Sequence, residues 1–497
     1  MSLTAEKTLL VASLGRATNA GLVEAARLLD RRLPAVEVRL DSLLEAPGLP
    51  AMREAFRGRT LLGTLRSRGE GGRFEGTPAE AATLLGAALD AGFDLVDVEH
   101  ALAGDGLLGL PKERVVASAH DVTGVPGDLE GLAARLLGSG ARYVKLVTTA
   151  GRLDDALRLL RLQASRADGR LAAFGMGETG LVTRALAPFL GAALSFGAAV
   201  PGEATAPGQL LATDLLDVYA VGRPRRVEEL FALLGARVSH SLSPAIQNAT
   251  FEAVGRPALY VPVALGSLAA ELPRLREALE AMGLPLRGAS VTIPFKEAAA
   301  EVAGVAAGGV ANTLLFGRDG SVSAANTDRE ALLGAIPVAP EGGSALVLGA
   351  GGMARSAVEA LVTRGWTVDV TARNAARAAG LASACGARAV ANPAASGLPY
   401  GVVMNATPLG LDESDPLPCD ASLLGPGILA FDAPYRPGGT PFSREAIRRG
   451  AHVVDGFALL LSQAAGQAAL FTGLPVDAAT LAARLPARFR SLFEVNP

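Results

Sequence analysis

The feature that most constrains the fold is a regular alternation along the first part of the chain. Residues 7 to about 197 repeat a short apolar or β-branched run followed by a helical stretch rich in Ala, Leu and Arg. Eight such runs in about 210 residues predict an α/β fold, a (β/α)8 TIM barrel near its minimum length. The predicted strands are Thr8–Ser13, Ala35–Asp41, Thr60–Arg66, Leu95–Glu99, Val115–Ala119, Tyr143–Val147, Leu171–Gly175 and Ala192–Phe196.

Polar side chains gather where these predicted strands end. The carboxyl ends of the strands form the face on which such barrels carry their chemistry. We therefore expect an active site among Glu37, Arg39, Arg66, Glu70, Glu99, His120, Lys145 and Arg184.

Lysine usage points to two active sites. Only four of the 46 Lys and Arg residues are lysines. Arginine keeps its proton at any accessible pH, whereas a desolvated lysine can lose it and act as a nucleophile or proton carrier. Lys7 and Lys112 are expected in solvated segments, but Lys145 lies within a predicted strand and Lys296 ends the run Gly288–Lys296. Because Lys145 and Lys296 are 151 residues apart, we predict two separate sites.

Composition narrows the class of protein. The net charge is −3 with no basic block, which gives no sign of a nucleic-acid partner. Two cysteines and no basic-then-apolar leader favour a reducing, cytoplasmic location. Residues 456–476 lack charge and could span a bilayer by length, but Gln463 and Gln467 share one helical face. We predict a buried helix that presents Gln463 to a cleft, and no membrane partner.

The chain divides at a short segment, residues 221–226, that is expected to be a solvated connector. After it come a mixed α/β region and then a strand, a glycine-rich turn and a helix. We expect a fused, two-lobed α/β second half with a Rossmann lobe. The predicted domains are the barrel at 1–222, a substrate-binding lobe at 228–331, the Rossmann lobe at 332–455, and C-terminal helices at 456–497 that pack on the substrate-binding lobe.

The glycine-rich turn predicts a dinucleotide site. It follows the apolar run Ser344–Leu348, which is typical of a buried parallel strand. Glycines there allow a tight turn and let a pyrophosphate approach the N-terminus of the next helix. We expect the cofactor to be bound by Gly349, Ala350, Gly351, Gly352 and Met353.

The end of the next predicted strand, Trp366–Ala372, selects the cofactor. NAD sites place an acidic residue there for the ribose 2′-hydroxyl. This chain has Ala372, Arg373 and Asn374, with Arg377 one turn later. Arginines suit a 2′-phosphate by charge and by bidentate geometry, so we predict NADP(H).

Several motifs of the second half occur together in one order. They are Val238–Pro244, Val291–Lys296, Ala325–Asp328, Asn405–Gly410, Asp432–Pro437, Thr440–Pro441 and the segment from Asp455 to Gln463. With them, residues 230–497 resemble shikimate dehydrogenase. The resemblance implies that Lys296 and Asp328 form the proton-handling pair, since hydride addition to a ketone leaves an alkoxide that must be protonated.

The same resemblance assigns the binding residues. Ser241 and Ser243 are implied to bind the substrate carboxylate, and we expect His240 to order this serine loop. Departures from the family pattern are Ser290 in place of asparagine and Gln247 in place of histidine. The remaining implied residues are Thr292, Asn312, Asp328, Tyr435 and Gln463 for the substrate, and Thr407, Ala433 and Gly456 for the cofactor.

A second resemblance covers essentially all of residues 5–222. Its motifs are Val36–Asp41, Thr64–Arg66, Glu70–Gly72, Asp97–Glu99, Ser118–Asp121, Lys145, the segment from Met176 to Arg184, and Ala206–Gln209. They resemble type I 3-dehydroquinate dehydratase. This resemblance implies that Lys145 forms a Schiff base with the substrate ketone, that His120 is the general base and acid, and that Glu70 orients His120.

The dehydratase resemblance also implies a set of substrate-binding residues. Arg184 would bind the carboxylate in bidentate fashion. Two alternatives remain open: Glu37 and Arg39 could form a structural ion pair, and Glu99 could be structural. The other implied binding residues are Ser13, Glu37, Arg39, Arg66, Thr205 and Gln209.

Together the two resemblances imply consecutive steps on one carbon skeleton. The barrel would dehydrate 3-dehydroquinate to 3-dehydroshikimate, and the second half would reduce this ketone to shikimate with NADPH. The alternative is an NAD-linked quinate/shikimate dehydrogenase fused to a non-catalytic barrel. We expect no metal, because the four histidines and two cysteines form no cluster with ligand spacing. Nothing in the sequence ranks a monomer against a dimer.

Overall fold

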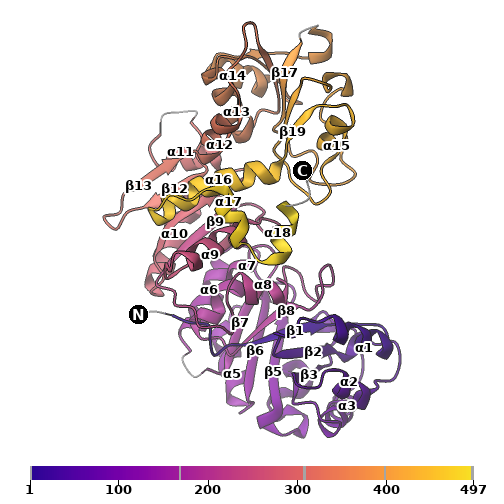
Figure 1. Cartoon of the computed structure of the whole chain (residues 1–497). Helices are drawn as coiled ribbons and strands as arrows, with labels where there is room; N and C mark the ends of the chain where they lie inside the picture. The colour runs from indigo at the N-terminus through magenta and orange to yellow at the C-terminus, as the bar shows by residue number, and fades with distance from the viewer. Residues whose placement is uncertain (1–2, 167–168, 306–308, 397–398, 494–497) are drawn as a thin grey trace. The chain divides into compact units, whose positions relative to one another are not determined.

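The computed structural model describes residues 3–166, 169–305, 309–396 and 399–493. The chain divides into two compact units. The first unit comprises residues 1–244 and 257–286, and the second comprises residues 245–256 and 287–497. Figure 1 labels many of the elements of both.

The first unit is built around an eight-stranded parallel sheet in the order β7-β6-β5-β4-β3-β2-β1-β8. The backbone N–H of Ala193, just before β8, donates to the Leu171 carbonyl of β7 at 2.9 Å and so joins the two edges. The predicted barrel is therefore confirmed. Its strands are β1 (Leu9–Leu14), β2 (Ala35–Arg39), β3 (Thr60–Thr64), β4 (Leu95–Glu99), β5 (Val115–Asp121), β6 (Tyr143–Thr149), β7 (Leu171–Met176) and β8 (Leu194–Ala198).

Helices follow the strands because the intervening segments carry helix starts and apolar faces. Before α3, Thr77 and Glu80 form a capping box, with Pro78 at the first helical position. The helices are α1 (Asn19–Leu28), α2 (Leu49–Ala55), α3 (Pro78–Asp90), α4 (His100–Ala103), α5 (Leu129–Gly138), α6 (Leu153–Ala164), α7 (Leu181–Leu186) and α8 (Ala212–Asp217).

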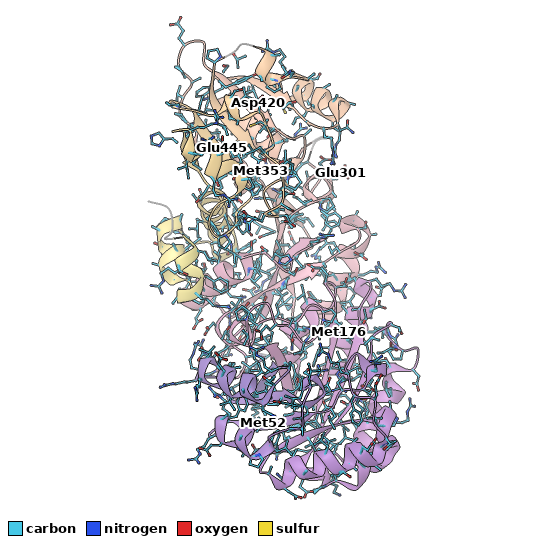
Figure 2. The ribbon with its side chains drawn as sticks, turned by 90° about the vertical axis from the view of Figure 1, so that its right-hand side faces the viewer. Met52, Met176, Glu301, Met353, Asp420 and Glu445 are labelled. Carbon is cyan, nitrogen blue, oxygen red and sulfur yellow. The ribbon has the colours of Figure 1, made fainter. Side chains whose placement is uncertain are left out.

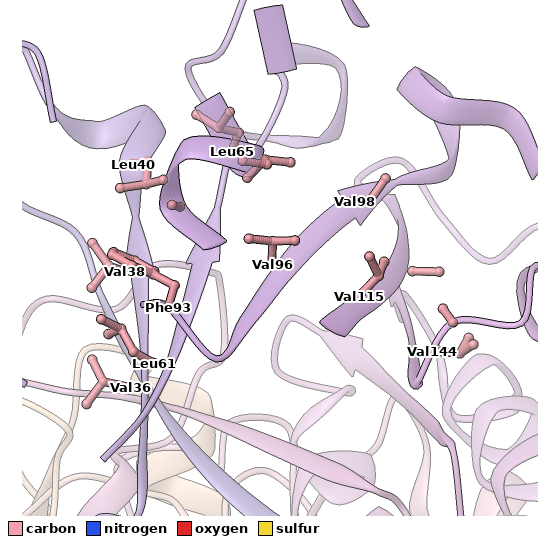
Figure 3. Close-up of a cluster of buried hydrophobic side chains, with 14 of the residues drawn as sticks. Val36, Val38, Leu40, Leu61, Leu65, Phe93, Val96, Val98, Val115 and Val144 are labelled. Carbon is pink, nitrogen blue, oxygen red and sulfur yellow. The ribbon is translucent and has the colours of Figure 1, made fainter. Parts of the chain in front are cut away.

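Strand alternation separates the core of the barrel from its chemistry. Successive side chains of a strand point to opposite faces. Val36 and Val38 of β2, like Val96 and Val98 of β4, belong to the apolar cluster shared with the helices (Figure 3). Glu37 lies between the first two valines, so its carboxylate is directed to the interior of the barrel. Lys145 of β6 is placed there in the same way, between Val144 and Leu146 of that cluster.

The first unit continues past the barrel. Strands β9 (Glu229–Gly235) and β10 (Ala258–Ala264) pair in parallel, and α10 (Leu268–Ala281) follows them. The expected solvated connector is instead anchored. Val221 is fully buried, the Gly222 N–H donates to the Ala5 carbonyl at 3.0 Å, and Arg225 donates to the Ala258 carbonyl at 2.7 Å.

The second unit begins with an antiparallel group. It comprises β11 (Leu286–Val291), β12 (Thr313–Phe316) and β13 (Val322–Ala325), with α11 (Lys296–Val302) after β11 and α12 (Thr327–Ala335) after β13. Helix α9 (Ser243–Ala253) lies mostly in this unit.

The Rossmann lobe is a six-stranded parallel sheet in the order β16-β15-β14-β17-β18-β19. This order places a switch point between β14 and β17, where dinucleotides bind in such sheets. The strands are β14 (Ser344–Leu348), β15 (Thr367–Thr371), β16 (Arg388–Ala389), β17 (Tyr400–Asn405), β18 (Leu429–Asp432) and β19 (His452–Val454), and the helices are α13 (Gly352–Thr363), α14 (Ala375–Cys385) and α15 (Pro441–Arg448).

The uncharged segment of the sequence forms α16 (Gly456–Thr472), which packs on α12 and β12 and precedes α17 (Ala478–Arg484) and α18 (Ala487–Phe493). Its residue Gln467 is buried and donates to the Asn312 carbonyl at 3.1 Å. Over the described residues, no helix has the length and apolar character needed to cross a membrane.

A glycine in β8 tests the close contact between the barrel wall and α8. A Cβ atom at Gly197 would lie 2.5 Å from Cα of Ala212, which is backbone that cannot move aside cheaply. Gly197→Ala should lower the free energy of unfolding of the barrel by about 1–3 kcal/mol, measured from the midpoint of urea unfolding.

Gly86 is the matched control, because it lies inside α3 and its added Cβ would meet nothing nearer than 3.8 Å. Gly86→Ala should be neutral or stabilising by about 0.5–1 kcal/mol. Equal stability of Gly197→Ala and the unchanged chain would contradict the steric argument.

Candidate active sites

The first candidate site surrounds Lys145 at the centre of the barrel. Lys145 is 5% exposed, and its Nζ donates to Glu37 Oε1 at 3.1 Å and to Asp97 Oδ2 at 3.3 Å. The Nζ atom also lies 4.1 Å from the centroid of the Phe196 ring. The amine is thus held on three sides while the strands fix its direction.

Glu37 is held by three hydrogen bonds. Ser13 donates to its Oε2 at 2.6 Å and Thr64 to its Oε1 at 2.9 Å. Burial opposes its ionisation, but the charges of Lys145 and Arg39 and the bond from Ser13 outweigh burial and lower its pKa to about 2. Glu37 therefore stays charged beside Lys145.

Arg66 connects most of the remaining carboxylates. Its guanidinium donates to Asp97 at 3.0 Å, to Glu99 at 2.8 Å and to Glu70 at 3.1 Å. Glu99 also accepts the Ser67 N–H at 2.8 Å. These two contacts favour a structural role for Glu99, because through them its carboxylate holds the Arg66 side chain and the Ser67 backbone.

His120 and Glu70 form the pair that the sequence suggests. His120 Nδ1 lies 2.9 Å from Glu70 Oε2, which also accepts the His120 backbone N–H at 3.0 Å. Burial, together with the nearby carboxylates Glu99 and Asp97, raises the pKa of Glu70 to about 8 despite Arg66. Burial and the positive charges of Arg66 and Lys145 lower the pKa of His120 well below its usual value, so this imidazole is neutral at neutral pH.

Arg184 is suited to an anionic ligand. It is 4% exposed on α7, and its Nε and Nη2 atoms are buried without a hydrogen-bond acceptor among the described residues. Burial lowers its pKa to about 10. Its guanidinium lies 4.9 Å from the Phe174 ring centroid, which leaves its donors for a carboxylate.

Arg39 does not pair with Glu37. It binds Asp41 in a bidentate contact, both bonds at 2.8 Å, and Glu37 binds Lys145 instead. The open alternative of a Glu37–Arg39 ion pair therefore has no support. On the loop before α8, the N–H of Thr205 donates to Gln209 Oε1 at 2.8 Å.

Two inward residues of this site were absent from the sequence-based set. Asp97 touches both Lys145 and Arg66, and Ser118 donates to Asp97 at 2.5 Å. The signal that could have found them is strand alternation. Both residues lie between apolar neighbours of the outer cluster on β4 and β5, so a polar side chain there must face inward.

The second candidate site lies in the second unit. Lys296, the first residue of α11, donates to Asp328 Oδ2 on α12 at 2.5 Å, and both side chains are largely buried. Gly352 of the nucleotide turn packs beside the lysine: an added Cβ would lie 3.0 Å from Lys296 Cδ. The paired lysine thus sits against the turn that begins α13.

A polar network extends from this pair. Asn312 donates to Thr327 Oγ1 at 2.9 Å and to Gln463 Oε1 at 3.4 Å. Gln463 comes from α16, as predicted from its helical face. Thr292 lies in the turn between β11 and α11, where its carbonyl accepts the Phe295 N–H at 2.9 Å.

The two departures from the dehydrogenase pattern are accommodated by α16. Ser290 donates to Gln467 Oε1 at 2.7 Å. Gln247 is fully buried and donates to the Ala464 carbonyl at 3.1 Å. Both residues therefore serve to hold α16, and the site keeps its charged groups.

The serine loop belongs to the first unit. Ser243 is 5% exposed, and its N–H donates to Ser241 Oγ at 3.2 Å. His240, which we expected to order this loop, has an exposed side chain. The loop backbone is held instead by the carboxylate of Glu178, to which Val238 and Ser239 donate.

The nucleotide turn fits a dinucleotide. Gly349 has φ of +118° and a Cβ there would lie 2.9 Å from the Ala406 carbonyl oxygen, so only glycine suits the position. Helix α13 has no side-chain cap, and Gly351 has open space around it. The free N–H groups can bind phosphate. Figure 2 labels Met353 in the first turn of this helix, with Ala350 in the preceding turn.

The predicted 2′-phosphate residues follow β15. Arg373 and Asn374 are exposed, and the Asn374 side chain caps α14 by accepting the Arg377 N–H at 3.0 Å. Ala372 directly follows β15 and is partly buried. Arg377 is exposed and lies 3.9 Å from Glu297. No acidic side chain stands at residues 372–374, which fits a 2′-phosphate.

Asp432, the last residue of β18, anchors the loops at that end of the strand. It accepts from Asn405 Nδ2 at 2.9 Å and from the Thr440 hydroxyl. Asn405 in turn accepts from the Thr407 hydroxyl at 2.7 Å. Burial raises the pKa of Asp432 to about 6.

The start of α16 packs tightly against the segment after Asp432. A Cβ at Gly456 would lie 2.7 Å from the Ala433 carbonyl oxygen, so this close approach requires glycine. The rings of Tyr435 and Phe457 are 5.2 Å apart. These residues line a pocket with Asp432, Arg436 and Asp455.

Comparison with known proteins finds a matching family for each half of the chain. The type I 3-dehydroquinase family profile matches residues 11–223, and the shikimate dehydrogenase substrate binding domain profile matches residues 233–313. The shikimate dehydrogenase (NADP(+)) of Caulobacter vibrioides is 39% identical over 247 residues, which cover 46% of this chain and 85% of the relative.

Solved structures with both or one of these parts are also similar. Dehydroquinate dehydratase and shikimate dehydrogenase from S. pombe AroM is 22% identical, with a TM-score of 0.41, and the match covers 96% of this chain and 98% of that one. Shikimate 5-dehydrogenase from Thermus thermophilus, in complex with NADP(H) and shikimate, is 36% identical with a TM-score of 0.44, covering 51% and 96%.

One relative spans the two halves together. The chloroplastic bifunctional 3-dehydroquinate dehydratase/shikimate dehydrogenase of Arabidopsis thaliana is 32% identical over 493 residues, which cover 91% of this chain and 80% of the relative. With a buried lysine in the barrel and a lysine–aspartate pair beside the nucleotide turn, the chain belongs to the family of bifunctional 3-dehydroquinate dehydratase/shikimate dehydrogenases.

Proposed function

We propose that the barrel converts 3-dehydroquinate to 3-dehydroshikimate through Lys145, and that Lys296 and Asp328 handle the proton when the second half reduces 3-dehydroshikimate to shikimate with NADPH. The observation that carries the proposal is that each of the two lysines is buried against a carboxylate, at 3.1 Å and 2.5 Å. A scaffold barrel would have no need to bury Lys145 among Glu37 and Asp97.

In the first reaction, the amine of Lys145 adds to the C3 ketone, and loss of water gives a cationic Schiff base. The positive nitrogen stabilises the negative charge that remains at C2 when its proton leaves. The C1 hydroxyl then departs with a proton as water, and hydrolysis of the Schiff base returns Lys145 and releases the product. Glu37 and Asp97 stabilise the cationic nitrogen through the contacts that they make with the ammonium group.

His120 takes the C2 proton and returns a proton to the departing hydroxyl. Its depressed pKa supports the role of base, because the imidazole is neutral at neutral pH. Glu70 selects the useful tautomer: as a carboxylate it accepts a proton-bearing Nδ1 and leaves Nε2 free to act as the base.

The remaining groups bind the substrate. Arg184 binds the carboxylate, and its unpartnered donors support this role. Arg66 holds the carboxylates around the site rather than reaching outward. Hydroxyl groups and the closing loop are assigned to Ser13, Glu37, Arg39, Thr205 and Gln209.

In the second reaction, Lys296 donates a proton to the oxygen of the reduced ketone, and Asp328 orients the ammonium group. NADPH, when bound, supplies the hydride. Contact between Gly352 and the Lys296 stem supports this assignment, because it brings the lysine beside the turn that binds the nucleotide. Ring hydroxyls are assigned to Thr292, Asn312, Asp328 and Gln463, and the carboxylate to Ser241 and Ser243. Tyr435 is also assigned to the substrate.

The cofactor is bound along the switch point of the Rossmann lobe. The pyrophosphate is assigned to the turn from Gly349 to Met353, and Thr407, Ala433 and Gly456 are also assigned to the cofactor. The domains that serve these roles are 1–222, 228–331, 332–455 and 456–497. The sparse cysteines support a cytoplasmic location.

Borohydride trapping tests the Schiff base. When the protein is incubated with 3-dehydroquinate and then reduced, peptide mass spectrometry should find an adduct on Lys145, because reduction makes the carbon–nitrogen bond permanent. Lys296 in the same sample is the internal control and should stay unmodified. An unmodified Lys145 under turnover conditions would contradict the barrel assignment and favour the scaffold alternative.

The pH profile tests the role of Glu70. Its pKa is raised to about 8, so the carboxylate that fixes the His120 tautomer forms only as the pH rises through that value. Dehydratase kcat/KM should therefore increase with pH across this range, since kcat/KM reports the free enzyme. In Glu70→Gln this limb should disappear, because the amide oxygen accepts from Nδ1 at every pH. The activity at high pH should fall, because a neutral amide stabilises the imidazolium that forms on His120 less than a carboxylate does. An unchanged profile would exclude Glu70 as the orienting group.

Cofactor preference tests Arg373. Arg373→Ala should raise the KM for NADPH by roughly 10–100-fold, as expected for a lost hydrogen bond to a charged group, while the KM for NADH changes little. Arg318→Ala is the matched control, since Arg318 lies in the β12–β13 turn, away from the predicted 2′-phosphate residues in the chain. A strong preference of the unchanged enzyme for NADH would overturn this assignment.

A further inference from the structure

Glu178 of the barrel contacts the serine loop, residues 238–243. It lies in the turn that leads from β7 to α7, and its Oε1 atom accepts the backbone N–H groups of Val238 and of Ser239, the latter at 2.8 Å. Both segments belong to the first compact unit. A carboxylate with two backbone donors on one oxygen is a specific, charge-assisted arrangement.

These two N–H groups open the turn that displays the substrate-binding serines. The Ser241 N–H donates to the Val238 carbonyl at 3.3 Å, which closes the turn over Val238–Ser241. The Ser243 N–H then donates to Ser241 Oγ at 3.2 Å. The Glu178 carboxylate therefore fixes Val238 and Ser239, the first residues of a hydrogen-bonded segment that continues to Ser241 and Ser243.

The turn that carries Glu178 is itself held by hydrogen bonds to segments of the dehydratase site. The Leu181 N–H donates to the Glu178 carbonyl at 3.3 Å, and the Arg184 N–H donates to the Gly180 carbonyl at 3.4 Å. The Gly177 N–H donates to the Pro207 carbonyl at 3.2 Å, which joins the turn to the loop that carries Thr205 and Gln209. One turn thus leads to the carboxylate-binding Arg184 and, through Glu178, to the serine loop.

We propose that Glu178 is a positioning residue for the dehydrogenase reaction: the barrel supplies the carboxylate that holds the serine loop in its substrate-binding shape. This inference rests on the proposed role of Ser241 and Ser243. Glu178 touches neither substrate, and it acts through the backbone of the loop. The dehydrogenase half therefore depends on the barrel for the geometry of its carboxylate site.

The test is steady-state kinetics of both activities in the full chain. Glu178→Ala should raise the KM for shikimate by roughly tenfold, since a disordered loop loses binding that is equal in ground and transition states. The kcat for shikimate, the KM for NADP and the dehydratase kcat/KM should each stay within about twofold. Glu178→Gln keeps an oxygen acceptor without the charge, so its KM should lie between those of the alanine variant and the unchanged enzyme.

Asp154→Ala is the matched control. Asp154 of α6 accepts from Arg274 of α10 at 2.8 Å, so this variant also removes a contact between the barrel and the segment after β10, but away from the serine loop. It should leave the KM for shikimate unchanged. An equal rise in Asp154→Ala and Glu178→Ala would overturn the proposal, because it would reveal general loosening rather than positioning.

Ser241→Ala separates a failure of the positioning role of Glu178 from a failure of the proposed role of the serine loop. If Ser241→Ala raises the KM for shikimate and Glu178→Ala does not, the positioning role is wrong and the proposed function stands. If neither variant changes that KM, the assigned role of the serine loop fails, and the positioning role fails with it.

Discussion

The arrangement on which the dehydratase site depends is a buried charge network inside the barrel. Lys145 and Arg66 are surrounded by Glu37, Asp97, Glu99 and Glu70, all on the inner face of the strands or just beyond it. Burial of such groups is unfavourable unless each is paired. Here the carboxylates outnumber the cations, so burial and like charges act most strongly on the group at the edge, and Glu70 carries the raised pKa. The network therefore leaves Glu37 ionised next to Lys145 and Glu70 available to change protonation beside His120.

The second site is also built around a lysine and a carboxylate, but it contains fewer charged groups than the first. One carboxylate, Asp328, partners one lysine, and neutral hydrogen-bonding groups complete the site through Asn312, Thr327 and Gln463. A proton donor for an alkoxide needs a retained positive charge, whereas an amine that forms a Schiff base must also exist without its proton. Lys145 contacts two carboxylates and an aromatic ring, whereas Lys296 contacts one carboxylate and the glycine turn before α13.

Sequence reasoning predicted the parts of the fold that follow from local periodicity. The eight barrel strands are present with ends shifted by no more than two residues, and β14 matches its predicted range. The polar residues at strand ends meet in one site because parallel strands bring their carboxyl ends together. Strand alternation could have placed Asp97 and Ser118 on the inner face, but it does not say which side chains of other strands they bind. The pairing of Arg39 with Asp41 depends on the turn after β2. The anchored segment around Arg225 was missed because its charge indicated solvent, while its guanidinium binds backbone carbonyls.

Sequence reasoning also missed the contact of Glu178 with the serine loop. Sequence patterns assigned the ordering of the serine loop to His240, its neighbour in the chain, because a pattern within one motif favours local partners. The structure places a residue 60 positions away there instead. A short turn with glycines at both ends can carry such a residue, since Gly177 adopts φ of +82° and Gly180 approaches the Gly175 backbone too closely for any side chain. The turn is thus fixed by its own backbone, and a carboxylate on it has a defined direction. Under the proposed role of the serine loop, fusion of two enzymes in one chain gives more than proximity, because a turn of the barrel holds that loop.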